Sequence, residues 1–330
     1  MKLGTEKTAA ADGRLLVVSR DLTRVMAADG IAATLQDALE NWDEVAAPLH
    51  EIYEQLNAGT RQGTRDYEST EFAAPLPRAW QWLDGSAFPE HGKLMARAFN
   101  KPPIETDAPL MYQGMSHRFL GPTEAACFPA EADAIDFEGE FAVITGAVPM
   151  SADPNMAVQA IRLLVQVNDW SLRRYAVPEM RTGFGWILAK PACSMAPVAV
   201  TPDELESCWV NNRITATLEV ERSDMWFGAV PADEMELGFD DLIVHAARTR
   251  DLCAGTIIGS GTVSHSRYPE VGSCCIAERQ AIEIIEHGRA KTDYLCFNER
   301  VRMWATANES NLPIFGVIDQ EVVKAGVILT

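Results

Sequence analysis

The chain has 330 residues, of which 28 are Lys or Arg and 47 are Asp or Glu, so its formal net charge is −19. This balance argues against nucleic acid and against an anionic membrane surface as partners, because both attract proteins with a basic face. Hydrophobic residues make up 47% of the chain, which is ordinary for a globular protein of this length and provides a core that needs no disulfides.

No apolar run reaches the roughly 18 residues that a membrane span requires. Residues 1–7 contain no apolar stretch of the signal-peptide type. The seven cysteines are irregularly spaced and include no CxxC pair, which argues against a zinc site built from paired thiolates. We therefore expect reduced thiols in a cytoplasmic protein.

The first 75 residues predict a small module that packs and carries no chemistry. Residues 14–28 predict a β-hairpin that turns at Arg20-Asp21. Apolar residues then recur at steps of three and four from 35 to 56, which predicts a helix, with a kink expected at Pro48. Thr34 and Asp37 resemble a capping box at its start. Residues 57–75 are polar and rich in Gly and Thr, so we interpret them as a linker.

From residue 76 to residue 330 the pattern is typical of a second, β-rich domain. Helical patterns are fewer than strand patterns, and the two do not alternate as βαβ units do. This disfavours a doubly wound parallel sheet and favours an α+β fold. The predicted strands are 140–146, 161–168, 213–221, 254–259, 296–305 and 313–318, and the predicted helices are 155–160, 238–250 and 277–287.

Acidic residues alternate with apolar residues in segment 135–144, which predicts a strand with Asp136, Glu138 and Glu140 on one face. Glu138 and Glu140 lie about 6.6 Å apart along such a strand, so their like charges repel. A hard divalent cation such as Mg²⁺ or Ca²⁺ would remove that repulsion. The alternative is a solvent-facing strand whose charges discourage aggregation. We expect Asp136, the outer acid, to neutralise a cation rather than to bind metal.

A third carboxylate favours the metal interpretation. Asp169 ends an apolar strand, from which it can project into the same cleft, and Arg173 and Arg174 follow. Arg173 either neutralises the carboxylates or holds an anionic substrate beside the metal. Arg174 is expected to be a surface or pairing residue.

Five short motifs follow one another in the second domain: Glu138-Gly139-Glu140, the segment from Asn168 to Arg173, Lys190 with Ser194, the stretch from Gly255 to Thr262, and the segment from Ser273 to Glu278. In type and order they resemble those of the fumarylacetoacetate hydrolase family, and the resemblance runs from about residue 75 to the C-terminus. It implies a β-rich catalytic domain of mixed β-sandwich or roll type. It also implies activity on enolisable oxo-acids, as a hydrolase, decarboxylase, hydratase or isomerase.

The hydrolase branch of this family has a similar Asp and His seven residues apart, as in Asp84 and His91. The resemblance implies that His91 is the general base, that Glu278 orients it, and that Lys190 and Arg173 stabilise developing negative charge. It further implies a divalent cation, Mg²⁺ or Ca²⁺ with Mn²⁺ as a further candidate, and a homodimer. The implied metal ligands are Asp84, Glu138, Glu140 and Asp169, and the implied substrate contacts are Tyr112, Ser194 and Thr262.

Each of these roles has a simpler alternative. His91 could be a solvated loop residue, Lys190 a surface lysine, and Glu278 half of an ion pair on a helix surface. The function that the resemblance favours is hydrolysis of fumarylacetoacetate to fumarate and acetoacetate, as in tyrosine and aromatic catabolism. The alternatives are an acylpyruvate hydrolase, an oxo-acid decarboxylase or isomerase, and a non-catalytic protein that binds a metal and a small acid.

Overall fold

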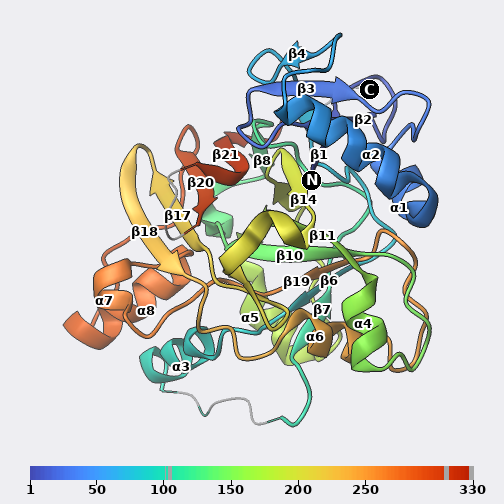
Figure 1. Ribbon diagram of the computed structural model, residues 1–330. Coiled ribbons are helices and arrows are strands. Elements are labelled where there is room, and N and C mark those ends of the chain that lie inside the picture. Colours follow the sequence, from blue (N-terminus) through green and yellow to red (C-terminus); the bar gives the residue numbers. More distant parts are fainter. Residues whose placement is uncertain (101, 103–105, 308–311, 327–330) are drawn as a thin grey trace.

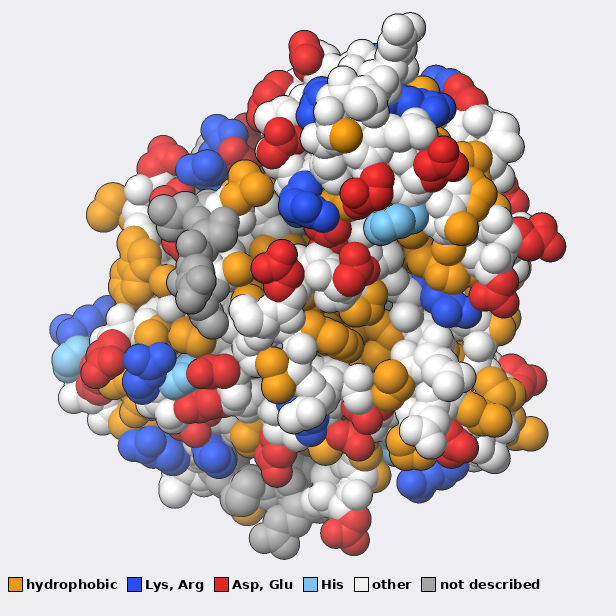
Figure 2. All heavy atoms as spheres, viewed as in Figure 1, with side chains coloured by type: hydrophobic (Ala, Val, Ile, Leu, Met, Phe, Trp, Pro, Cys, Tyr) orange, Lys and Arg blue, Asp and Glu red, His pale blue; other side chains and the backbone are white. Residues whose placement is uncertain are grey.

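The computed structural model describes residues 1–100, 102, 106–307 and 312–326. Strands predominate over helices, as the sequence predicts, and the fold is α+β. Acidic and basic side chains are interspersed over the face in view (Figure 2). Within the described residues, no helix is both long and apolar enough to cross a membrane. All seven cysteines are free thiols.

A twelve-stranded sheet crosses the middle of the molecule (Figure 1). Neighbouring strands are antiparallel, except that the strands at 82–85 and 257–259 run parallel. Two further short strands, β13 (Ser194–Met195) and β5 (Phe72–Ala73), pair beside this path. The path is β4 (Arg65–Asp66), β3 (Arg24–Ala27), β2 (Arg14–Val18), β1 (Lys2–Glu6), β14 (Val198–Val200), β11 (Ile161–Asn168), β10 (Gly139–Thr145), β19 (Ile257–Gly259), β6 (Trp82–Gly85) and β7 (Met111–Gln113).

A five-stranded sheet packs against the larger one, and their side chains share one hydrophobic core. Phe141 and Phe315 meet across that core, with ring centroids 6.0 Å apart. The order of this sheet is β18 (Met225–Pro231), β17 (Thr217–Arg222), β20 (Arg300–Thr306), β21 (Pro313–Lys324) and β8 (Ala126–Phe128). Two short pairs complete the strands: β9 (Ile135–Asp136) with β12 (Ser171–Leu172), and β15 (Trp209–Val210) with β16 (Arg213–Ile214).

The helices lie around the sheets (Figure 1). Two of them, at 89–98 and 276–287, pack together through Leu94, Ala281 and Ile282. This contact brings the side chains of His91 and Glu278 side by side. The α-helices are α1 (Leu35–Glu40), α2 (Trp42–Asn57), α3 (Pro89–Ala98), α4 (Pro154–Ala160), α5 (Arg173–Thr182), α6 (Phe239–Ala246), α7 (Tyr268–Val271) and α8 (Ile276–His287), and the 3₁₀ helices are Glu131–Asp133 and Pro202–Cys208.

The N-terminal predictions are largely confirmed. The hairpin is β2 and β3, and the Thr34 hydroxyl accepts a hydrogen bond from the Asp37 N–H at 3.1 Å. The long helix, however, is interrupted at Asn41, whose φ of −117° and ψ of 28° end α1. Pro48 lies inside α2 on its exposed side, so the interruption of the predicted helix is at Asn41 and the kink at Pro48 stays a prediction.

The segment 57–75, expected to be a linker, contains β4 and β5, which pair with β3 and β1. Hydrogen bonding to the sheet therefore orders part of a stretch whose polar composition alone predicts a loop. The strand predicted over 135–144 is also divided, into β9 and β10. The break lies at Phe137 and Glu138, where the Glu138 N–H donates to the Asn168 side-chain oxygen at 3.0 Å.

Candidate active site

Three buried carboxylates converge at the centre of the large sheet. Asp84 on β6, Glu140 on β10 and Asp169 just after β11 each offer an oxygen, and these oxygens lie within 4.8 Å of one another. β19 separates β6 from β10, and its Gly259 leaves room for the cluster, because a Cβ there would lie 2.1 Å from Asp84 Oδ1. The acids are buried, so the solvent-facing alternative for this strand is wrong.

Asp84 and Glu140 carry the unbalanced charge of this cluster. Neither forms an ion pair within the described part of the chain, and neither Glu140 oxygen accepts a hydrogen bond there. Burial, together with the neighbouring carboxylates, raises the pKa of Asp84 and of Glu140 well above the usual values. Two buried carboxylates without a cationic partner match the charge of one divalent cation, and their oxygens are the donors that hard cations prefer.

Asp169, in contrast, is surrounded by donors. Its Oδ2 lies 2.5 Å from Lys190 Nζ and accepts a hydrogen bond of 2.5 Å from the Tyr112 hydroxyl. Its Oδ1 accepts a hydrogen bond from the Cys193 thiol, with a sulfur–oxygen distance of 2.9 Å. Lys190 is buried, so the surface alternative for this lysine is wrong. Burial would lower the pKa of Lys190, but the charges of Asp169 and Glu138 outweigh it and raise this pKa.

Glu138 lies beside the three-carboxylate cluster but is not part of it. Among the described residues, the carboxylate oxygens that all lie within 4.8 Å of one another belong to Asp84, Glu140 and Asp169. Its Oε1 is 2.7 Å from Arg173 and 3.1 Å from Lys190 Nζ, and it accepts a hydrogen bond from Ser171. Its Oε2 accepts a hydrogen bond of 2.8 Å from Thr262. Burial alone would raise the pKa of Glu138, but the charges of Lys190 and Arg173 outweigh it and lower the pKa. Its role as a fourth metal ligand stays a prediction.

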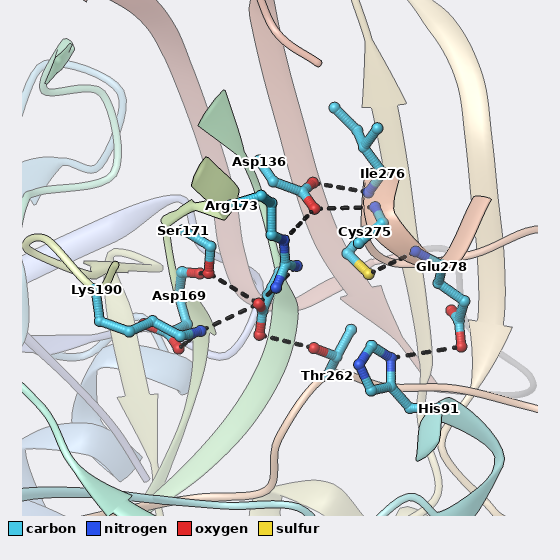
Figure 3. A network of polar contacts seen from close by, with 12 residues as sticks. His91, Asp136, Asp169, Ser171, Arg173, Lys190, Thr262, Cys275, Ile276 and Glu278 are labelled. Carbon is cyan, nitrogen blue, oxygen red and sulfur yellow. Dashed lines mark hydrogen bonds and ion pairs between the residues drawn. The ribbon is translucent and has the colours of Figure 1, made fainter. Parts of the chain in front are cut away.

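Arg173 connects this region to Asp136. Its Nε donates to Asp136 Oδ2 at 2.8 Å, and the same carboxylate accepts the backbone N–H groups of Ile276 and Ala277 at the start of α8 (Figure 3). Asp136 therefore neutralises an arginine, as expected, and helps to anchor α8. Arg174, as predicted, is mostly exposed, with 61% of its side chain accessible.

His91 and Glu278 form a pair at the contact between α3 and α8. His91 Nδ1 lies 3.7 Å from Glu278 Oε1 (Figure 3). That oxygen also accepts a hydrogen bond from Ser264. Glu278 is buried, and its neighbour Arg279 donates to the Phe227 carbonyl instead, so the surface ion pair is wrong. His91 keeps 23% of its side chain exposed. A ligand atom of His91 lies within 4.8 Å of the Cys275 sulfur, and Cys275 forms an isolated β-bridge with Glu138, so the imidazole lies beside the carboxylates.

Ser194 is less directly connected to the cluster. Its hydroxyl accepts a hydrogen bond of 2.8 Å from the Trp170 indole in the core, so its substrate contact stays a prediction. Three residues near the site were not singled out for it from the sequence: Trp186, Cys193 and Cys275. Trp186 packs edge-on against the Tyr112 ring, with centroids 4.9 Å apart. The only sequence signal for these residues is their position within or just before the motifs that contain Lys190 and Glu278.

Comparison with family models gives two matches that together cover most of the chain. Residues 1–78 match the model described as fumarylacetoacetase N-terminal domain 2. Residues 81–309 match the fumarylacetoacetate (FAA) hydrolase C-terminal model. Among curated proteins, the mitochondrial oxaloacetate tautomerase Fahd2a of Rattus norvegicus is 26% identical over 164 residues. That alignment covers 47% of this chain and 48% of the relative, so the match spans about half of each protein.

Solved structures share the fold over almost the whole chain. A maleylpyruvate hydrolase from Sphingobium sp. SYK-6, in complex with manganese(II) and pyruvate, superposes with a TM-score of 0.65 at 16% identity, covering 99% of this chain and 100% of that one. A probable 2-hydroxyhepta-2,4-diene-1,7-dioate isomerase from Mycobacterium abscessus gives a TM-score of 0.65 at 18% identity, with the same coverage.

Proposed function

Because this chain belongs to the fumarylacetoacetate hydrolase family, we propose that it is a divalent-cation-dependent hydrolase of a carbon–carbon bond in a β-diketo acid, with fumarylacetoacetate as the first substrate to test. One observation carries the proposal: the His91–Glu278 pair stands beside buried carboxylates that Lys190 and Arg173 contact. A general base, a cation site and two positive charges are the groups that such a hydrolysis needs.

The residues present fit a divalent cation. Asp84, Glu140 and Asp169 would hold it, with Glu138 beside them, because Asp84 and Glu140 have no cationic partner in the part of the chain that the structure describes. When bound, the cation supplies Lewis-acid polarisation of the carbonyl oxygens of the substrate. A carboxylate site suits Mg²⁺, Ca²⁺ and Mn²⁺ alike, and manganese is the ion in the maleylpyruvate hydrolase complex.

His91 would act as the general base. With Nδ1 directed at Glu278, its Nε2 is the nitrogen that accepts a proton from water. Glu278, whose Oε1 lies 3.7 Å from Nδ1, would favour this tautomer and stabilise the imidazolium that forms, as the acid does in a catalytic triad. The resulting hydroxide adds to a carbonyl carbon of the substrate. When the adjacent carbon–carbon bond breaks, the departing enolate takes up the proton that His91 removed.

Lys190 and Arg173 would stabilise the negative charge of this pathway. Both side chains are largely buried, so their charges act through a medium that screens them less than water does. Tyr112 and Trp186 form an aromatic wall beside Lys190, with ring centroids 5.4 and 5.6 Å from Nζ. This wall would face the substrate, in agreement with the substrate contact expected for Tyr112. We also propose a homodimer, from the family resemblance, and a cytoplasmic location, from the irregular spacing of the cysteines.

A second candidate is an oxo-acid tautomerase or isomerase. The names of the rat relative and of the Mycobacterium abscessus structure favour it. Such a reaction moves a proton between carbon and oxygen and activates no water.

The test is loss of the diketone absorbance of fumarylacetoacetate with Mg²⁺ and then with EDTA, while fumarate and acetoacetate are measured. Acylpyruvates and oxaloacetate follow as further substrates. In His91→Ala, cleavage should fall by about 10²–10⁴-fold, the usual contribution of a general base. His50→Ala, a change of an exposed histidine on α2, is the control. Retained cleavage in His91→Ala, or tautomerisation without cleavage in the unchanged protein, would refute the hydrolase mechanism.

A further inference from the structure

A second group of metal-binding side chains lies at the α3–α8 contact. His91, Cys275 and Glu278 each offer one ligand atom, and these atoms lie within 4.8 Å of one another. We propose that they form a site for a borderline-soft divalent cation such as Zn²⁺, and that filling it inactivates the protein by occupying the His91–Glu278 pair. The inactivation rests on the function proposed above, whereas the binding does not.

The geometry needs little adjustment to hold such an ion. Zinc bonds of about 2.0–2.3 Å in a tetrahedron place the ligand atoms roughly 3.3–3.8 Å apart. His91 Nδ1 and Glu278 Oε1 are already 3.7 Å apart. His91 Nδ1 is also buried and has no hydrogen-bond partner among the described residues, so a donor atom already faces the site without a competing bond.

The donor set separates this site from the carboxylate cluster. Asp84, Glu140 and Asp169 offer oxygen atoms alone, which suit hard cations. An imidazole nitrogen, a sulfur and one carboxylate oxygen instead suit zinc and cobalt, and three protein ligands leave a fourth position for water. The sequence argued against zinc because no two cysteines are suitably spaced. The fold builds this site from a single cysteine, Cys275, together with Glu278 in the first turn of the same helix and His91, which is distant in the sequence.

The site is reachable on one side. His91 keeps 23% of its side chain exposed, while Cys275 and Glu278 are buried, so an ion would enter past the imidazole. Cys275 is also the N-cap of α8, where its sulfur accepts the Glu278 N–H at 3.3 Å. On binding, the thiol proton is released to solvent and the sulfur binds as thiolate. Serine can keep the cap while offering a much poorer ligand, so Cys275→Ser removes the site with little change to α8.

The experiment uses Co²⁺ as a probe, added to full-length protein that is already saturated with Mg²⁺. Thiolate bound to Co²⁺ gives a charge-transfer band in the near ultraviolet, which reports sulfur coordination without any turnover. The band should appear in the unchanged protein and in Cys193→Ser, which alters the thiol beside the carboxylate cluster. It should be lost in Cys275→Ser and in His91→Ala. Far-ultraviolet circular dichroism and a cooperative thermal transition establish that each variant is folded.

Zinc inhibition supplies the functional half of the test. With Mg²⁺ saturating, the Zn²⁺ concentration that halves the turnover of whichever substrate proves active should rise more than about tenfold in Cys275→Ser, since one of three ligands is gone. A cobalt band that persists in Cys275→Ser, or that disappears only in Cys193→Ser, overturns the proposed site. So does the absence of any band in the unchanged protein. A protein that shows the band but cleaves no β-diketo acid retains the metal site and loses only the proposed function.

Discussion

Replacing Glu140 by Gln should have opposite effects on stability with and without a divalent cation. Among the described residues, no donor reaches either buried Glu140 oxygen, and the pKa of Glu140 is raised by burial and by nearby carboxylates. The amide cannot ionise and can donate to Asp84, so in EDTA the variant should be more stable by about 1–3 kcal/mol, the penalty of an unsatisfied buried group. With a cation at 100 times its Kd, the unchanged protein gains about 2.7 kcal/mol. A variant that binds 100-fold more weakly gains only about 0.4 kcal/mol.

Urea unfolding in EDTA and in saturating Mn²⁺, at several pH values, measures these differences. A carboxyl group whose pKa is raised in the folded state holds a proton that the unfolded chain has lost. The stability of the unchanged protein in EDTA should therefore fall as pH rises above the usual glutamate pKa of 4.5, and this fall should be smaller in the variant.

Asp136→Asn is the matched control, because Asp136 is equally buried but is paired with Arg173 and two backbone N–H groups. It should destabilise the protein by about 3–5 kcal/mol in both conditions. The reasoning is refuted if Glu140→Gln destabilises the protein in EDTA or keeps the full response to Mn²⁺.

Three further predictions concern other charged side chains. Lys190→Met leaves Asp169 and Glu138 without this buried cation, so urea unfolding in EDTA should show a loss of about 3–5 kcal/mol, and a smaller loss would contradict the pairing. Burial lowers the pKa of Lys2 from 10.5 to about 8, so between these pH values the unfolded chain binds more protons than the folded protein. The free energy of unfolding should therefore rise with pH in this range, by at most about 3 kcal/mol, and Lys2→Met should abolish the rise. Glu179 accepts the N–H groups of residues 187–189, so Glu179→Ala should speed hydrogen exchange at those amides while exchange in β10 stays unchanged.

The elements that follow from local periodicity were predictable from the sequence. β11 spans 161–168, as predicted, and α8 begins within one residue of its predicted start. The departures occur where tertiary contacts outweigh local pattern. β4 and β5 form within a polar stretch because β3 and β1 offer unpaired edges to them. The segment 135–144 alternates like one strand, yet it divides where Glu138 bonds to the Asn168 side chain.

The list of acidic site residues could be drawn up from the sequence, but their charge balance could not. Strand alternation treats Glu138 and Glu140 as equivalent, since both lie on the same face. The fold makes them unlike: Lys190 and Arg173 reach Glu138, and neither forms an ion pair with Glu140. That asymmetry depends on the path of the loop that carries Lys190, which no spacing in the sequence specifies.

The family resemblance implies that Glu278 orients His91, but nothing in the sequence places Cys275 beside them. The three residues meet because apolar side chains hold α3 against α8 and because Asp136 anchors the first turn of α8. Asp136 is also held by Arg173, which contacts Glu138 beside the carboxylate cluster. Arg173 thus links the position of α8, which carries Glu278, to the charge of the proposed cation site. A change in Arg173 should accordingly disturb both cation binding and the His91–Glu278 pair, whereas a change in Glu140 should affect cation binding and leave the pair undisturbed.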